Sequence, residues 1–145
     1  MGKVRMALAA VLLFALPVAG GAQTEDSAMT RITVTVDGVA LAATLDDTPA
    51  GRDFASLLPL DLTLSDYHAT EKVADLPRAL DTTGAPARYA AQTGDITLYA
   101  PWGNLAIFYK PFPATAGLVR LGAFDEPIDA LLKDGEFRVQ IERAE

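Results

Sequence analysis

The stretch Asp95–Tyr109, DITLYAPWGNLAIFY, decides the fold. Two apolar runs flank the segment Pro-Trp-Gly, which contains the only tryptophan of the chain, Trp102. Proline suits the second position of a type I turn, and a glycine suits the position that follows the turn. The stretch therefore predicts a β-hairpin with strands at residues 95–100 and 104–110. We expect this hairpin to fill a core and to shape the end of the sheet.

Alternation of apolar and polar residues, typical of strands with one buried face, recurs on both sides of this hairpin. Near the start of the domain it is interrupted by Asp37-Gly38, a strong hairpin signal because both residues tolerate positive φ. With the two strands of the hairpin, the pattern predicts about eight short strands. The further runs are residues 31–36, 39–45, 60–64, 71–76, 117–124 and 137–143.

Two short helices with one apolar stripe each are also predicted. In residues 46–59, Thr48 or Asp47 can cap the helix and Pro49 fits its first position. In residues 125–135, Asp125 is the expected cap and Gly135 the expected end. The stripes consist of Phe54, Leu57 and Leu58 in the first helix, and of Ile128, Leu131 and Leu132 in the second.

A sheet with a single apolar face must be covered or must close on itself. Two short helices cannot cover eight strands, but they can plug the open ends of a barrel, and side chains just fill an eight-stranded barrel. The sequence therefore predicts a mainly β protein. Its residues 30–145 form one closed, mainly antiparallel eight-stranded barrel with two short capping α-helices.

The N-terminus has the layout of a secretory signal peptide. Lys3 and Arg5 precede an apolar run, Met6–Val18, that is too short to span a bilayer, and small residues follow at 19–22. We expect residues 1–22 to be cleaved and residues 23–29 to be a flexible lead-in. The protein is then exported, periplasmic or secreted, without an integral membrane segment.

Composition excludes several functions. The chain has no cysteine and one histidine, His68, which excludes thiol catalysis, iron–sulfur sites and multi-histidine metal sites within one chain. With 12 Lys and Arg against 19 Asp and Glu, it is repelled by phosphate backbones, so nucleic acid is not an expected partner. No glycine-rich phosphate loop or dinucleotide fingerprint is present. We therefore expect no metal and no cofactor.

Four segments, in this order, resemble the cyclophilin-like family of small bacterial proteins. They are RDFASLLPLDLTLSDY (52–67), EKVADLPRAL (71–80), GAPARY (84–89) and GDITLYAPWGNLAIFY (94–109). The resemblance extends from about Ile32 to Ile141 and implies a cyclophilin-type barrel with eight strands and two capping helices. The F-H-R, Q-F-F and W-L-D segments of the true cyclophilin groove are not found, so the resemblance transfers no isomerase residue.

Candidate site residues gather around a groove expected between the loop Pro77–Thr93 and the Trp102 hairpin. A loop arginine beside an aromatic residue could grip an extended peptide or a carboxylate. A glutamate that points into a pocket would have a raised pKa and would be the best general-base candidate. The candidates are Arg52, Glu71, Arg88, Tyr89, Tyr99, Trp102, Asn104 and Tyr109.

Structural roles are the competing interpretation for these residues. We expect Trp102 to fold back over the barrel rim and to pack on a capping helix. Arg52 then pairs with its neighbour Asp53, and Asn104 belongs to the turn. The hydroxyl groups of the flanking Tyr99 and Tyr109 satisfy backbone groups at the rim.

Two functions remain open at this point, besides the role of a stable barrel that acts in a complex with a partner encoded elsewhere. The first is an exported, non-catalytic binding module for a peptide or a small molecule. The alternative is a divergent peptidyl-prolyl cis-trans isomerase with Arg52 or Arg88 as its electrostatic residue. An isomerase needs a guanidinium over an apolar groove wide enough for proline, whereas a binding module needs only the groove. The sequence does not determine the oligomeric state.

Overall fold

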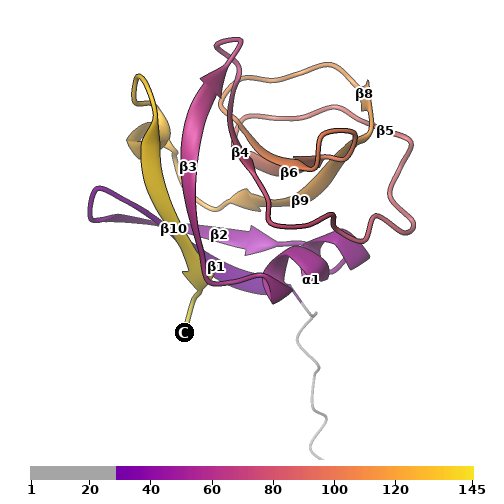
Figure 1. Ribbon diagram of the computed structural model, residues 1–145, viewed down its shortest axis with the longest axis horizontal. Coiled ribbons are helices and arrows are strands. Elements are labelled where there is room, and N and C mark those ends of the chain that lie inside the picture. Colours follow the sequence, from indigo (N-terminus) through magenta and orange to yellow (C-terminus); the bar gives the residue numbers. More distant parts are fainter. Residues whose placement is uncertain (1–28) are drawn as a thin grey trace, which may run out of the picture.

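The computed structural model of the protein describes residues 29–145, in which eight antiparallel strands close into a barrel (Figure 1). Around the barrel the strands follow the order β1-β10-β3-β4-β7-β6-β9-β2. Their bounds are β1 Thr30–Val36, β2 Val39–Leu45, β3 Leu60–Tyr67, β4 Glu71–Asp75, β6 Asp95–Tyr99, β7 Asn104–Phe108, β9 Leu118–Phe124 and β10 Phe137–Arg143. The predicted mainly β barrel is confirmed.

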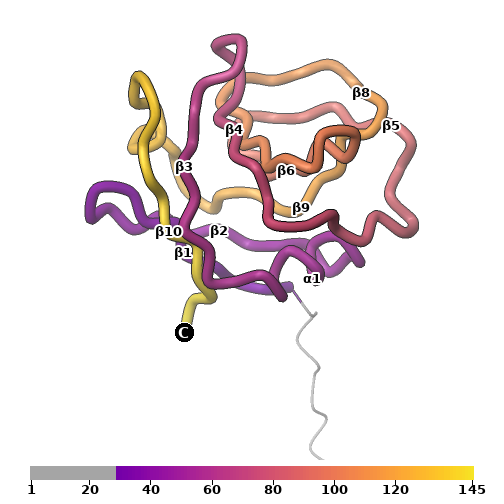
Figure 2. Tube along the Cα trace, in the orientation of Figure 1, coloured from indigo at the N-terminus to yellow at the C-terminus, as the bar shows by residue number. Residues whose placement is uncertain are grey.

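The predicted signal peptide and the lead-in, apart from its last residue, lie outside the described residues. Within residues 29–145, no helix has the length and apolarity needed to cross a membrane. The first and last strands are neighbours in the barrel: β10 lies between β1 and β3, and Val34 of β1 pairs with Ile141 of β10 (Figure 2).

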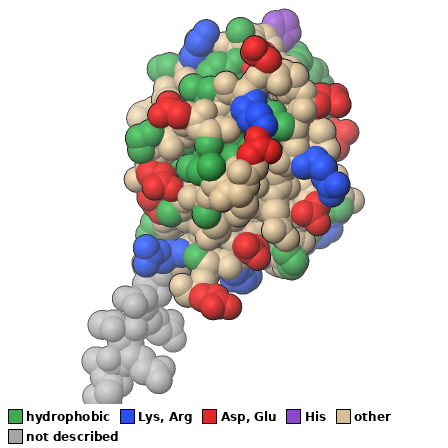
Figure 3. Space-filling model, turned by 90° about the vertical axis from the view of Figure 1, so that its left-hand side faces the viewer, with side chains coloured by type: hydrophobic (Ala, Val, Ile, Leu, Met, Phe, Trp, Pro, Cys, Tyr) green, Lys and Arg blue, Asp and Glu red, His purple; other side chains and the backbone are tan. Residues whose placement is uncertain are grey.

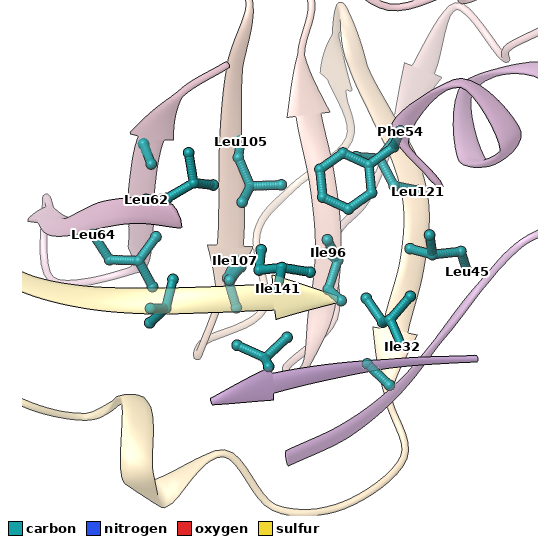
Figure 4. Packing of buried hydrophobic residues seen from close by; sticks show 14 of the residues in the cluster. Ile32, Leu45, Phe54, Leu62, Leu64, Ile96, Leu105, Ile107, Leu121 and Ile141 are labelled. Atoms are coloured by element: carbon teal, nitrogen blue, oxygen red, sulfur yellow. The ribbon is translucent and has the colours of Figure 1, made fainter. Parts of the chain in front are cut away.

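The strand period places alternate side chains inside the barrel, where they form one core (Figure 4). Within β10, for example, Phe137, Val139 and Ile141 are buried and the residues between them are exposed. The largest side chains with almost no exposed surface are Phe54, Phe108, Ile32, Leu45, Leu64, Ile96, Leu98, Leu105, Ile107, Leu121, Leu131 and Ile141. Side chains from all eight strands and from one helix fill the interior, as expected for a barrel of this size.

That helix, α1 (Pro49–Ser56), is confirmed together with its start. The Thr48 hydroxyl oxygen accepts a hydrogen bond from the Gly51 N–H at 3.0 Å, and Pro49 occupies the first turn. Phe54 is completely buried and points into the barrel core (Figure 4). The helix therefore contributes its largest apolar side chain to the barrel interior.

The second predicted helix is wrong: the segment contains only a 3₁₀ turn, η1 (Asp129–Leu131). Asp125 does not cap a helix, because its carboxylate accepts a hydrogen bond from the Thr44 hydroxyl at 2.9 Å. Glu126 Oε1 accepts from the Ala42 N–H at 2.8 Å, so two neighbouring residues attach the segment to β2. Leu131 is buried as expected, but Leu132 is 50% exposed.

The Trp102 hairpin, β6 and β7, is buried on both of its faces. Inside it contributes to the barrel core, and outside it carries a second apolar cluster, formed by Ala91, Ala106, Phe108 and Leu118. Tyr89 packs on this cluster from β5 (Arg88–Tyr89), which pairs with β8 (Thr115–Ala116). Double burial explains why this stretch is the most continuously apolar part of the domain.

Asp53 of α1 binds the start of the long loop that follows β4 through hydrogen bonds. Its carboxylate accepts hydrogen bonds from both terminal nitrogens of Arg78, at 2.9 and 2.8 Å, and from the Asp81 N–H at 2.7 Å. The Arg78 and Asp81 hydrogen bonds lower the pKa of Asp53 to about 2 from its usual 3.8. Folding therefore favours the ionised form of this carboxyl group.

Replacing Asp53 by asparagine is expected to reduce stability in a pH-dependent way. Because the folded-state pKa lies below the unfolded value, the stabilisation is fully present above pH 3.8 and is lost as the pH falls toward 2. Urea unfolding of both proteins, measured at several pH values, should show a difference that shrinks over this window. A difference that stays constant down to pH 2 would contradict this role of the carboxylate.

Candidate functional site

A cavity of about 190 Å³ lies on the outer face of the barrel beside the Trp102 hairpin. It is lined by Tyr67, Glu71, Tyr99, Trp102, Asn104, Ala106, Phe108, Phe112, Thr115 and Leu118. These residues come from β3, β4, the β6–β7 hairpin, β9 and the segment between β7 and β9. We call this hollow the Trp102 cavity.

Strand β7 forms the floor of the Trp102 cavity. Because side chains alternate along a strand, Leu105 and Ile107 enter the barrel core while Asn104, Ala106 and Phe108 line the cavity. Asn104 and Phe108 are four residues apart on β7, so the two ends of the floor are separated by about 13 Å. The cavity is therefore elongated along the strand.

Aromatic rings form much of its wall. The Trp102 ring lies 5.1 Å from the Tyr99 ring and 5.9 Å from the Tyr67 ring, and both pairs are nearly perpendicular. The prediction that Trp102 packs on a capping helix is wrong, since its ring is held between two tyrosines and remains 63% exposed. An exposed indole held by two edge-to-face contacts has a fixed orientation at the edge of the cavity.

Asn104 is the polar group at one end of the floor. It is only 7% exposed, and its Oδ1 is the one buried side-chain nitrogen or oxygen in residues 29–145 without a hydrogen-bond partner. Its Nδ2 donates only a long bond, 3.5 Å, to the Leu105 carbonyl oxygen. The predicted role in the turn is wrong, because Asn104 begins β7 opposite Tyr99. An unpaired buried acceptor costs about 1–3 kcal/mol, and a ligand that donates a hydrogen bond would remove this cost.

Glu71 is the charged group at the other end of the floor. It pairs with Phe108 on β7 and with Tyr67 on β3, and its side chain is partly buried. Burial, and then repulsion by the Asp66 carboxylate, raise the pKa of Glu71. Its pKa therefore moves in the direction expected for a glutamate that points into a pocket.

A polar cluster lies next to Glu71 at the mouth of the barrel. Lys72 is 4% exposed and donates to the Lys133 carbonyl oxygen at 2.7 Å, with its Nζ 3.3 Å from Asp66 Oδ1. The Tyr109 hydroxyl donates to the same carboxylate at 2.5 Å. Tyr109 thus binds a side chain and not a rim backbone group, and burial together with Asp66 raises its pKa to about 12.

A second hollow, of about 480 Å³, lies between the start of α1 and loop residues 83–86. Tyr89 and Arg120 line it. The Arg120 Nε donates to Asp46 Oδ2 at 2.9 Å, and the Tyr89 hydroxyl donates to Asp95 Oδ2 at 2.5 Å. Arg120, the one cationic residue that lines this hollow, is therefore already paired with Asp46 and Asp95. None of the lining residues has a buried side-chain nitrogen or oxygen without a hydrogen-bond partner, in contrast to Asn104.

The structure divides the eight predicted site residues. Glu71, Tyr99, Trp102 and Asn104 line the Trp102 cavity, whereas Tyr89 lines the second hollow and Tyr109 belongs to the mouth cluster. Arg52 is exposed and pairs with Asp47, not with Asp53 as predicted. Arg88 is exposed on β5.

The predicted groove between the loop Pro77–Thr93 and the hairpin is not a single space. The loop lines the second hollow, and the Trp102 cavity is completed by the segment before β9. Sequence reasoning missed Tyr67 and Phe112, which reach the cavity from distant segments. The only feature of the sequence that could have identified these two residues as cavity-lining is that both are aromatic.

The described residues contain no group of three or more His, Asp or Glu side chains placed to hold a metal ion. On the face shown in Figure 3, acidic and basic side chains are interspersed. This face therefore carries no broad patch of one charge sign.

The chain was compared with known proteins by sequence and by structure. The sequence model of the Cyclophilin-like family matches residues 34–142. The solution structure of a hypothetical protein from Archaeoglobus fulgidus is similar with a TM-score of 0.64 and 18% identity, covering 83% of this chain and 99% of that one. No curated protein matches the sequence. At this identity, the structural similarity shows the fold alone.

Proposed function

Since the chain belongs to the cyclophilin-like family, whose model covers most of its barrel, we propose that it is a non-catalytic module that binds a peptide or small molecule in the Trp102 cavity. The observation that carries this proposal is the buried, unpartnered Oδ1 of Asn104. Aromatic walls with a few fixed polar groups are typical of ligand sites. We expect a hydrogen-bond donor of the ligand to pair with this oxygen.

The polar groups of the cavity favour binding over catalysis. Glu71 is its only ionisable carboxyl group. The other polar side-chain groups are the Asn104 amide, the Trp102 indole N–H and the hydroxyls of Tyr67, Tyr99 and Thr115. No basic side chain lines this cavity among the described residues, so a hydroxyl has no general base other than Glu71. An isomerase needs an arginine here, and neither Arg52 nor Arg88 lines it.

We also propose that the protein is exported and acts in the periplasm or outside the cell. This rests on the basic start, apolar run and small-residue segment at residues 1–22. Fractionation of producing cells, with the mass of the mature chain, would test it. Export is supported by a chain that begins near Gln23 in the exported fraction, and excluded by a full-length chain in the cytoplasm.

The binding function is tested by screening acidic, basic and uncharged short peptides and small molecules. Trp102, the only tryptophan, gives a fluorescence signal at the site, and amide NMR shifts report on the residues around it. A true ligand should lose about tenfold in affinity with Asn104→Leu, which removes the acceptor. That variant should fold with equal or greater stability, because it removes an unpaired buried polar atom.

Gln140→Leu is the matched control, because it exchanges an exposed amide on β10 for the same aliphatic side chain. It should leave binding unchanged. The proposal is wrong if no compound class changes the Trp102 signals, or if every ligand binds Asn104→Leu as tightly as the original protein. A prolyl isomerisation assay with Arg52→Ala and Arg88→Ala tests the alternative, which needs a rate above background that one variant abolishes.

A further inference from the structure

We propose that the Trp102 cavity selects a cationic ligand, with the ammonium group of a lysine-containing peptide against Glu71 and a peptide N–H donating to Asn104 Oδ1. The inference rests on the proposed binding function and names the class of ligand. It is carried by the two polar ends of the cavity, the rings between them, and the absence of a basic side chain among the described residues that line it.

The Glu71 carboxylate lacks a cationic partner within residues 29–145. Its immediate neighbour Lys72 is on the opposite face of β4, with its ammonium group held by Asp66 and by the Lys133 carbonyl oxygen. Asp66 in turn accepts a hydrogen bond from Tyr109. The mouth cluster is thus satisfied internally, and Glu71 remains as the unpaired anion. A partly buried carboxylate of this kind gains most from a cation supplied by a ligand.

Aromatic rings surround the position that a cation would take beside Glu71. Phe108 and Tyr67 are the cross-strand neighbours of Glu71, and Phe112 packs against Phe108 with a ring separation of 5.6 Å. The faces of such rings attract ammonium groups electrostatically, more strongly where water is excluded. A carboxylate among aromatic rings therefore favours a cation over a neutral group of the same shape.

The distance between the two polar ends decides the kind of cation. One ammonium group cannot reach both Glu71 and Asn104, because about 13 Å of β7 separates Asn104 from Phe108, the neighbour of Glu71. The ligand must therefore be elongated, with a charge at one end and a hydrogen-bond donor at the other. An extended peptide meets both demands, since lysine has its charge on a long aliphatic stem and the backbone has N–H donors.

The volume of the Trp102 cavity and the net charge of the chain agree with a lysine-containing peptide as the ligand. A volume of about 190 Å³ is below the usual range for drug-sized ligands, so the cavity holds a side chain and a short piece of backbone. The whole chain has a net charge of −7, which attracts cations from solution. Acidic peptides would be repelled both by this net negative charge and by the Glu71 carboxylate.

The test uses two peptides, acetyl-Ala-Ala-Lys-Ala-amide and the same peptide with norleucine, which has a similar stem without the ammonium group. Both are titrated into the full chain and followed by Trp102 fluorescence and amide NMR shifts. We expect the lysine peptide to bind about tenfold more tightly than the norleucine peptide. Glu71→Gln should abolish this preference. Glu142→Gln, which removes the same charge from an exposed position on β10, should preserve it.

Three results would overturn the assignment. If norleucine binds as tightly as lysine, the cavity does not select a cation, although it still binds peptides as proposed above. If the lysine preference persists in Glu71→Gln, the cation lies elsewhere. If neither peptide binds, the cationic ligand is excluded, and the wider screen decides the binding function by itself. The amide spectrum of Glu71→Gln verifies that the variant is folded.

Discussion

Phe54→Ala is expected to lower the free energy of unfolding by about 3–5 kcal/mol. Phe54 is completely buried and is the largest side chain that α1 contributes to the barrel core. Removing its ring leaves a cavity that strands held in a closed barrel cannot easily collapse to fill. Chemical denaturation of both proteins measures the loss directly.

Leu132→Ala is the control for this experiment. The sequence pattern places Leu132 in an apolar stripe like that of Phe54, but its side chain is 50% exposed after η1. Its replacement should change stability by less than about 0.5 kcal/mol. Equal losses for the two variants would mean that α1 does not close the core in the way described.

Gly122→Ala is expected to destabilise the barrel by about 3 kcal/mol or more, although it adds a single methyl group. A Cβ at Gly122 would lie 2.2 Å from the Thr44 carbonyl oxygen and 2.8 Å from the Leu45 Cα. Both are backbone atoms of β2, so the overlap can be relieved only by moving β9 away from β2. Thermal or urea unfolding, together with the amide spectrum, measures the effect.

Gly38→Asn provides the contrast. Gly38 is in the turn between β1 and β2 at φ 76°, with no atom within 4 Å of an added Cβ. Asparagine tolerates this backbone conformation, so the cost should be well below that of Gly122→Ala. A mild Gly122→Ala phenotype would show that β2 and β9 can separate without loss of the barrel.

The sequence predicts the barrel well because strand alternation and turn residues are local signals that the tertiary structure supports. Asp37-Gly38 makes the expected hairpin turn, and Thr48 caps α1. The second helix fails because tertiary contacts override a local pattern. Asp125 and Glu126 are bound to β2, and Ile128, which precedes η1, supplies no side-chain cap. Only one turn remains before the chain must enter β10.

The candidate site is predicted only in part, and the reason is again physical. Tyr99, Trp102 and Asn104 meet in one cavity because they belong to one hairpin, which the sequence pattern predicts. Glu71 joins them because β4 pairs with β7, which the hairpin pattern does not predict. The orientation of Trp102 depends on Tyr67, which is far away in the sequence. The unpartnered state of Asn104 is a property of packing in three dimensions, which no residue pattern reports.

The position of β10 also has a consequence for how the chain folds while it is being synthesised. A ribosome makes β10 after the other seven strands of the barrel, yet this strand is paired on one side with β1 and on the other with β3. Until residue 143 is available, the growing chain is an open sheet with two unpaired edges. Closure of the barrel must therefore wait until β10 has been made, and the nascent chain needs protection from pairing with other strands until then.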